Sequence, residues 1–157
     1  MTAPMDNDDF PPHLRHFEQI CKAAGLKLTH QRLEIYRELL EARDHPSAET
    51  LHKRLDARLP TLSLDTVYRT LTTFERLGLA HRLETRESQA RFEALSQRHH
   101  HFLCDRCGQV VDFTWPGFDM LALPPALTGI GTIHRTSAVI YGQCAACLAR
   151  EQNPTTR

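Results

Sequence analysis

The sequence predicts an α+β protein with an N-terminal winged helix-turn-helix domain and a small C-terminal α/β domain that holds a structural zinc. Three observations support this fold class. Apolar residues recur at helical spacing through the first eighty residues, short alternating runs follow from Leu79, and two Cys-x-x-Cys pairs lie beyond residue 100.

The composition is that of an ordinary globular protein, with 41% hydrophobic residues and 19 basic against 19 acidic residues in 157. The N-terminal run MTAPMDNDDFPP has neither a basic region nor an apolar core, and no apolar run is long enough to span a membrane. We therefore expect a cytoplasmic protein with no signal peptide. Because the cytosol disfavours disulfides, the five cysteines are interpreted as metal ligands or core residues.

Four helices are expected in the first eighty residues, because the apolar spacing is bounded by capping and breaking residues. The third helix is predicted to turn Leu51, Leu55 and Leu59 inward. The expected boundaries, in chain order, are Gly25 ending the first helix, Thr29 and His45-Pro46 around the second, Ser47 and Pro60 around the third, and Ser63 or Asp65 and Gly78 around the fourth.

The runs LAHRLET and ARFEAL, separated by RESQ, have the alternation of a β-hairpin, and helices followed by a hairpin indicate a winged helix. In that fold the fourth helix enters the major groove of DNA. Six basic residues against three acidic ones between His52 and Arg82 form a modest basic face. A solvated helix face would show the same pattern. The outward positions of the fourth helix are Asp65, Thr66, Tyr68, Arg69, Thr72 and Thr73.

The remainder of the chain is β-rich in HFLC, QVVDF and TSAVIYGQC, with Pro124-Pro125 limiting any helix between them. The spacing of each cysteine pair lets two thiolates reach one zinc, and four thiolates form a closed structural site. The 36 residues between the pairs indicate that a whole β-unit separates the two knuckles. Cys21 is expected to be a buried core residue instead. The zinc ligands are Cys104, Cys107, Cys144 and Cys147.

The histidine run predicts a second metal site. His99 and His101 point to one side of a strand and His100 to the other, and Asp112 in the paired strand can return to the side of His99 and His101. Two imidazoles and a carboxylate are compatible with iron, manganese, zinc or nickel. A solvated histidine run and haem binding by the triple histidine are the alternatives.

The motifs LTHQR, HPSAETLHKRL, LSLDTVYRTLTTFERLGL, RFE, HHH, CDRCGQVVDF and YGQCAAC resemble, in order and spacing, the ferric uptake regulator family of metal-dependent repressors. The resemblance implies a homodimer, an A/T-rich palindromic operator in double-stranded DNA, a C-terminal dimerisation domain held by the four-thiolate zinc, and iron or manganese between the domains. The implied regulatory ligands are His45, Glu93, His99, His101 and Asp112, and the implied DNA contacts are Lys27, Tyr68 and Arg69, beside Thr66 and Thr72. The composition changes along the chain predict a flexible N-terminus at 1–12, the winged helix at 13–95, the dimerisation domain at 96–149 and a tail at 150–157.

Within the family, Asp112 is typical of the peroxide-sensing branch, whereas Glu93 is more usual in the iron-sensing branch. We favour a peroxide sensor in which an iron-bound imidazole, His45 or His99, is oxidised, with an iron sensor as the alternative. No cysteine lies between Cys21 and Cys104, so a zinc sensor is disfavoured. A further metal site of some iron regulators is expected to be absent or damaged, because Arg98, His100 and Thr136 stand at its positions. A zinc enzyme is disfavoured because four thiolates leave no open position on the zinc, and we expect no enzymatic activity.

Overall fold

The structure is a computed structural model that describes residues 11–83, 85, 89–95 and 98–152. Most of the expected flexible N-terminus, most of the RESQ turn and the end of the tail therefore lie outside the described residues. The chain divides into two compact units, one formed by residues 1–84 with 89–96 and the other by residues 85–88 with 97–157. Each is described by itself.

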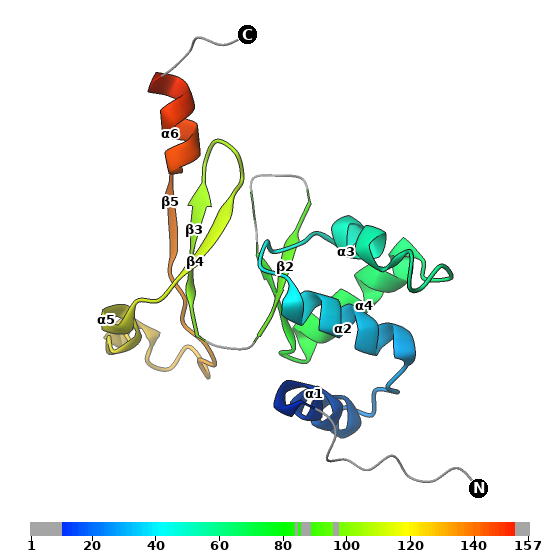
Figure 1. Cartoon of the computed structure of the whole chain (residues 1–157). Helices are drawn as coiled ribbons and strands as arrows, with labels where there is room; N and C mark the ends of the chain where they lie inside the picture. Colours follow the sequence, from blue (N-terminus) through cyan, green and yellow to red (C-terminus); the bar gives the residue numbers. More distant parts are fainter. Residues whose placement is uncertain (1–10, 84, 86–88, 96–97, 153–157) are drawn as a thin grey trace, which may run out of the picture. The chain divides into compact units, whose positions relative to one another are not determined.

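In its described residues, the N-terminal unit contains four helices followed by a two-stranded antiparallel hairpin, the arrangement of a winged helix (Figure 1). Local hydrogen bonds explain where the helices begin. The hydroxyls of Thr29, Ser47 and Ser63 each accept the backbone N–H three residues later, which satisfies a donor that the first helical turn leaves unpaired. The elements are α1 (Pro12–Ala23), α2 (His30–Glu41), α3 (Ala48–Leu55), α4 (Leu64–Arg76), β1 (Ala80–Leu83) and β2 (Arg91–Ala94).

Helices α1 and α4 end at the expected glycines. Gly25 and Gly78 have φ values of 65° and 70°, the left-handed conformation that closes a helix with little strain when the residue lacks a Cβ. Helices α2 and α3 end earlier than expected. Helix α2 stops at Glu41, before the His45-Pro46 break, and the prediction that Leu59 belongs to α3 is wrong. Leu59 is nevertheless buried, in the turn that follows α3.

The core of this unit is centred on three aromatic side chains from three helices. Phe17 of α1 stacks on Tyr36 of α2 with ring centroids 4.2 Å apart, and Phe74 of α4 meets both rings edge-on. Cys21 is buried beside them, as predicted. This core fixes α4 and the hairpin on one scaffold, so the outward residues of α4 are held in a defined arrangement.

The C-terminal unit is a three-stranded sheet of order β4-β3-β5, with β3 (His100–Cys104), β4 (Val110–Phe113) and β5 (Val139–Gly142). Strand β3 pairs antiparallel with β4 and parallel with β5. The connection from β4 to β5 carries α5 (Pro116–Asp119) and the 3-10 turn η1 (Pro125–Leu127), and α6 (Ala145–Gln152) follows β5 (Figure 1). Among the described residues, no helix has the length and apolar character to cross a membrane.

Candidate metal centres and DNA-binding surface

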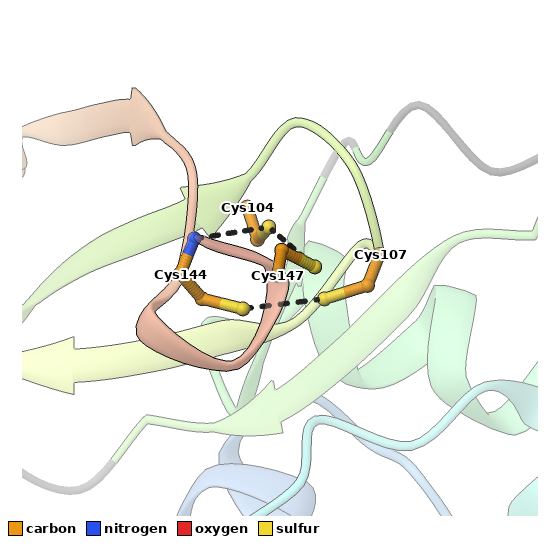
Figure 2. A group of neighbouring side chains, drawn as sticks. All are labelled: Cys104, Cys107, Cys144 and Cys147. Carbon is orange, nitrogen blue, oxygen red and sulfur yellow. Dashed lines mark hydrogen bonds between the residues drawn. The ribbon is translucent and has the colours of Figure 1, made fainter. Parts of the chain in front are cut away.

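The four predicted zinc cysteines lie together in the C-terminal unit, and their four sulfur atoms all lie within 4.8 Å of one another. Figure 2 shows the sulfurs converging from the β3–β4 turn and from the start of α6. The Sγ atoms of Cys104 and Cys147 are 3.9 Å apart and those of Cys107 and Cys144 are 3.7 Å apart. In a tetrahedral site with bonds of about 2.3 Å, sulfurs lie about 3.8 Å apart. The donor set therefore fits a tetrahedral zinc site with no open coordination position.

Two features of the backbone shape this site. The parallel register places Cys104 beside Gly142, so the second cysteine pair begins two residues after the point where the strands meet. A Cβ at Gly142 would lie 3.1 Å from the Phe102 ring, which explains the glycine before the second pair. Gly108, after the first pair, has a φ of 71°, as the tight knuckle turn requires.

Hydrogen bonding and burial separate the acidities of these thiols. Backbone N–H groups of Cys107 and Cys144 stabilise the Cys104 thiolate and lower its pKa to about 6. Burial, and after it the neighbouring thiols, raise the pKa of Cys147 to about 12, because a thiolate is unfavourable away from water and beside another thiolate. A divalent cation is needed to hold all four groups as thiolates near neutral pH.

The C-terminal unit also brings His99, His101 and Asp112 together. The Nε2 atoms of His101 and His99 lie 3.5 Å and 3.9 Å from Oδ1 of Asp112, and the two rings are 4.8 Å apart between centroids. Ligand bonds of about 2.1–2.2 Å at right angles separate two ligand atoms by about 3.0–3.1 Å. Small side-chain adjustments would thus let these three groups bind one ion.

The N-terminal unit places His45 against Glu93, with Nε2 of His45 3.3 Å from Oε2 of Glu93. His45 is the one non-glycine residue with positive φ (49°) in the part of the chain that the structure describes. Strand β2 holds this strained position: Phe92 donates its N–H to the Pro46 carbonyl at 3.0 Å, and Arg91 donates to the His45 carbonyl. Backbone strain of this kind is concentrated at functional sites. That all five groups bind one metal remains a prediction.

The sequence did not single out His81. Its Nδ1 lies 3.1 Å from Oε1 of Glu93. His52 hydrogen-bonds through Nε2 to the Leu62 carbonyl at 2.7 Å and links α3 to the turn before α4. Only the hairpin register could have revealed the first contact, because His81 is the register partner of Glu93.

His100 points to the other face of β3, as predicted, and is fully buried among Phe113, Trp115 and Phe118. Its Nε2 lies 3.3 Å from Oδ1 of Asp119, and the same oxygen lies 2.8 Å from Nε of Arg98. Arg98 also donates to Thr136. Arg98, His100 and Thr136, the positions at which a further metal site is expected to be absent or damaged, thus lie together, and the Arg98 guanidinium pairs with Asp119.

The predicted DNA-contacting residues lie on or just before the helices of the N-terminal unit. Tyr68 and Arg69 are exposed on α4, but the Tyr68 hydroxyl donates to Glu49 at 2.5 Å and Arg69 pairs with Asp65 at 3.1 Å. The first hydrogen bond lowers the pKa of the Glu49 carboxyl and raises that of the Tyr68 phenol. If these side chains contact DNA, as predicted, the DNA would have to compete for them with two carboxylates.

The other predicted DNA contacts have different surroundings. Lys27 is exposed in the loop before α2, and its carbonyl accepts from Nη1 of Arg32 at 2.5 Å. Thr66 lies with its hydroxyl 2.8 Å from that of Ser63, and Thr72 donates back to the Tyr68 carbonyl at 3.0 Å. Both hydroxyls are thus partly used within α4.

A pocket between the start of α2 and α4 was not predicted. Threonine hydroxyls and two guanidinium groups surround it, a lining that suits a phosphate. Its residues are Thr29, Gln31, Arg32, Thr66, Arg69, Thr70 and Thr73. Elsewhere the basic face is weaker than the composition suggested, because Arg54 pairs with Asp44 and Arg58 with Glu34 and Glu38.

A winged helix followed by a small sheet with a four-thiolate zinc-type site defines the class of protein: one that combines a DNA-binding fold with a zinc-type domain. The ferric uptake regulator family matches residues 23–122, and the chain belongs to this family. It is 33% identical to the peroxide operon regulator of Bacillus subtilis over 141 residues, which cover 89% of this chain and 97% of that protein.

Solved structures agree with this assignment. The manganese-bound ferric uptake regulator of Pseudomonas aeruginosa is 29% identical, with a TM-score of 0.66 over 82% of this chain and 97% of that one. The Helicobacter pylori ferric uptake regulator has the same fold, with a TM-score of 0.69 at 23% identity over 87% of this chain and 91% of that chain.

Proposed function

We propose that the protein is a metal-dependent DNA-binding transcriptional repressor that senses peroxide. One observation carries the proposal: the predicted regulatory ligands are divided between the units, with His45 and Glu93 on one and His99, His101 and Asp112 on the other. Each group is pre-arranged within its own unit at spacings close to those of metal ligands. Neither group alone completes a site for iron(II) or manganese(II), so an ion that takes all five links the units.

This division explains how metal would control DNA binding. An ion that binds only when both groups converge favours one arrangement of the units, and the DNA-binding helices of a dimer match successive major grooves in that arrangement. Moving the population from mostly open to mostly closed requires a preference of about 5.5 kcal/mol. Several metal–ligand bonds can supply a preference of this size.

The peroxide response rests on the ligand set and on the relatives. Three imidazoles and two carboxylates that each used one oxygen would supply five ligands and leave a position open, and Asp112 is the residue typical of the peroxide-sensing branch. Bound iron(II) would supply the chemistry that activates peroxide. One oxygen atom would then be added to a ring carbon of His45 or His99, giving 2-oxo-histidine, while the other leaves as water. Loss of that ligand lowers metal affinity and releases the operator.

A homodimer on a palindromic A/T-rich operator fits the two surfaces that the units present. Strand β5 lies at an edge of its sheet with Val139, Ile140 and Tyr141 exposed, beside an apolar groove lined by Phe102 and Val111. Exposed apolar edge strands pair readily with a second chain. The pocket between α2 and α4, whose lining suits a phosphate, would contact the DNA backbone. The exposed Tyr68 and Arg69 on α4 would contact the DNA as well.

Glu93 supports a second candidate, an iron-sensing repressor of the same architecture with no oxidation step, because glutamate at this position is more usual in that branch. Both candidates require metal-dependent DNA binding, so this property is tested first.

The test is a DNA-shift assay with the zinc-loaded dimer and its own promoter region, with and without manganese. We expect the parent to bind DNA only with manganese. His101→Ala and Asp112→Ala should not gain DNA binding when manganese is added. His134→Ala, at an exposed position in the same unit, is the control and should behave as the parent. Equal DNA binding with and without metal would overturn the proposal.

A further inference from the structure

Glu93 uses its two carboxylate oxygens for two different histidines of the N-terminal unit. His81 on β1 and Glu93 on β2 are direct register partners across the antiparallel hairpin, so their side chains emerge on the same face. Nδ1 of His81 lies 3.1 Å from Oε1, whereas Nε2 of His45 lies 3.3 Å from Oε2. The carboxylate is therefore held between the two imidazoles, one at each oxygen.

We propose that His81 is a positioning residue for the regulatory metal, which holds Oε1 of Glu93 so that Oε2 alone faces the ion. This inference rests on the proposed function. His81 is one-third exposed, whereas His45 and Glu93 are almost fully buried. The order of exposure places His81 at the rim of this group and His45 inside it.

The number of oxygen atoms through which Glu93 binds the ion explains what the contact with His81 would do. A carboxylate can bind an ion through one oxygen or through both. If Glu93 and Asp112 each bound the ion through one oxygen, the protein would supply five ligand atoms; a Glu93 bound through both oxygens would add a sixth. A donor on Oε1 would keep Glu93 to one oxygen, leaving more room for peroxide, and would fix the carboxylate's orientation, as hydrogen bonds around metal ligands generally do.

A direct ligand role for His81 is the competing explanation. The structure favours positioning, because Nδ1 of His81 faces a carboxylate oxygen at hydrogen-bond distance. The two roles differ in what can replace the imidazole. Glutamine retains an N–H donor for Oε1 but has no ring nitrogen to replace an imidazole ligand, so restored manganese binding would indicate a hydrogen-bonding role.

The experiment is a manganese titration of the zinc-loaded full-length protein, followed by the electron paramagnetic resonance signal of free manganese, without DNA. We expect His81→Leu to weaken manganese binding by roughly 10–100-fold and His81→Gln to restore most of the affinity. His16→Leu, at an exposed position on α1, is the matched control and should bind as the parent. Thermal unfolding of the manganese-free proteins should show that the N-terminal unit of each variant is folded and unfolds at the same temperature as in the parent.

Parent-like binding by His81→Leu would overturn the inference. So would a His81→Gln protein as weak as His81→Leu, which would make His81 a ligand or a packing residue. Glu93→Ala and His101→Ala are titrated alongside. If these two also bind manganese like the parent, the proposed regulatory site itself fails; if they lose binding while His81→Leu does not, only the role of His81 fails.

Discussion

Cys104 on β3 lies directly beside Gly142 on β5 in a parallel register, and this pairing brings together two cysteine pairs that are 36 residues apart in the sequence. The Cys144 N–H donates to the Cys104 sulfur at 3.3 Å. Cys104, Cys144 and Cys147, with Phe102 packed against them, form a buried cluster in the C-terminal unit. Since that cluster is small, zinc is expected to supply much of the unit's stability.

Replacing a zinc ligand should therefore unfold the C-terminal unit. Structural zinc contributes about 10–16 kcal/mol of binding free energy in small zinc domains, so Cys144→Ser is expected to lose bound zinc and the dimer. Zinc content and sedimentation measure the two effects. Cys21→Ala, a buried cysteine of the other unit, should retain zinc; a Cys144→Ser dimer with full zinc content would refute the assignment.

Acid should weaken zinc binding in a way that reflects the unequal thiols. Zinc binds thiolates, so apparent affinity falls wherever protons compete for them. The Cys147 thiol, with its pKa raised to about 12, must release its proton at neutral pH, whereas Cys104, with its pKa lowered to about 6, competes with protons only below that pH. The logarithm of apparent zinc affinity should fall more steeply with decreasing pH below pH 6 than above it, by about one proton. A chelator competition between pH 5 and pH 8 measures this slope, and an unchanged slope would contradict the role of Cys104.

The pocket between α2 and α4 predicts which arginines contact phosphate. Each phosphate contact contributes about −0.9 to the slope of log affinity against log salt. Arg32→Ala should therefore weaken DNA binding and make this slope shallower by about 0.9, measured by fluorescence anisotropy over a salt series. Arg58→Ala is the control, because Arg58 is paired with Glu34 and Glu38. Equal slope changes in the two variants would contradict a contact specific to Arg32.

Features that depend on local sequence were predictable. The caps at Thr29, Ser47 and Ser63 and the glycines after α1 and α4 involve residues only a few positions apart. The sides of β3 taken by His100 and His101 follow from strand alternation. The end of α3 was not predictable, because Pro60 shows where a helix cannot continue and not where it stops.

Features that depend on the pairing of distant segments were missed. The contact of His81 with Glu93 depends on the hairpin register. The alternation of the two runs fits registers that differ by two residues equally well, because such a shift keeps every side chain on the same face. The basic face was overestimated because α2 supplies carboxylates to Arg54 and Arg58 from outside the segment that was counted. The pocket at the start of α2 combines residues from two helices and has no signature in either.

The most direct test of peroxide sensing is mass spectrometry of the iron-loaded and manganese-loaded protein after peroxide treatment. We expect a gain of one oxygen on the peptide containing His45 or His99 in the iron form, with loss of DNA binding, and neither change in the manganese form. An iron form that keeps both peptides unmodified while still responding to iron would contradict peroxide sensing and support the iron-sensing candidate.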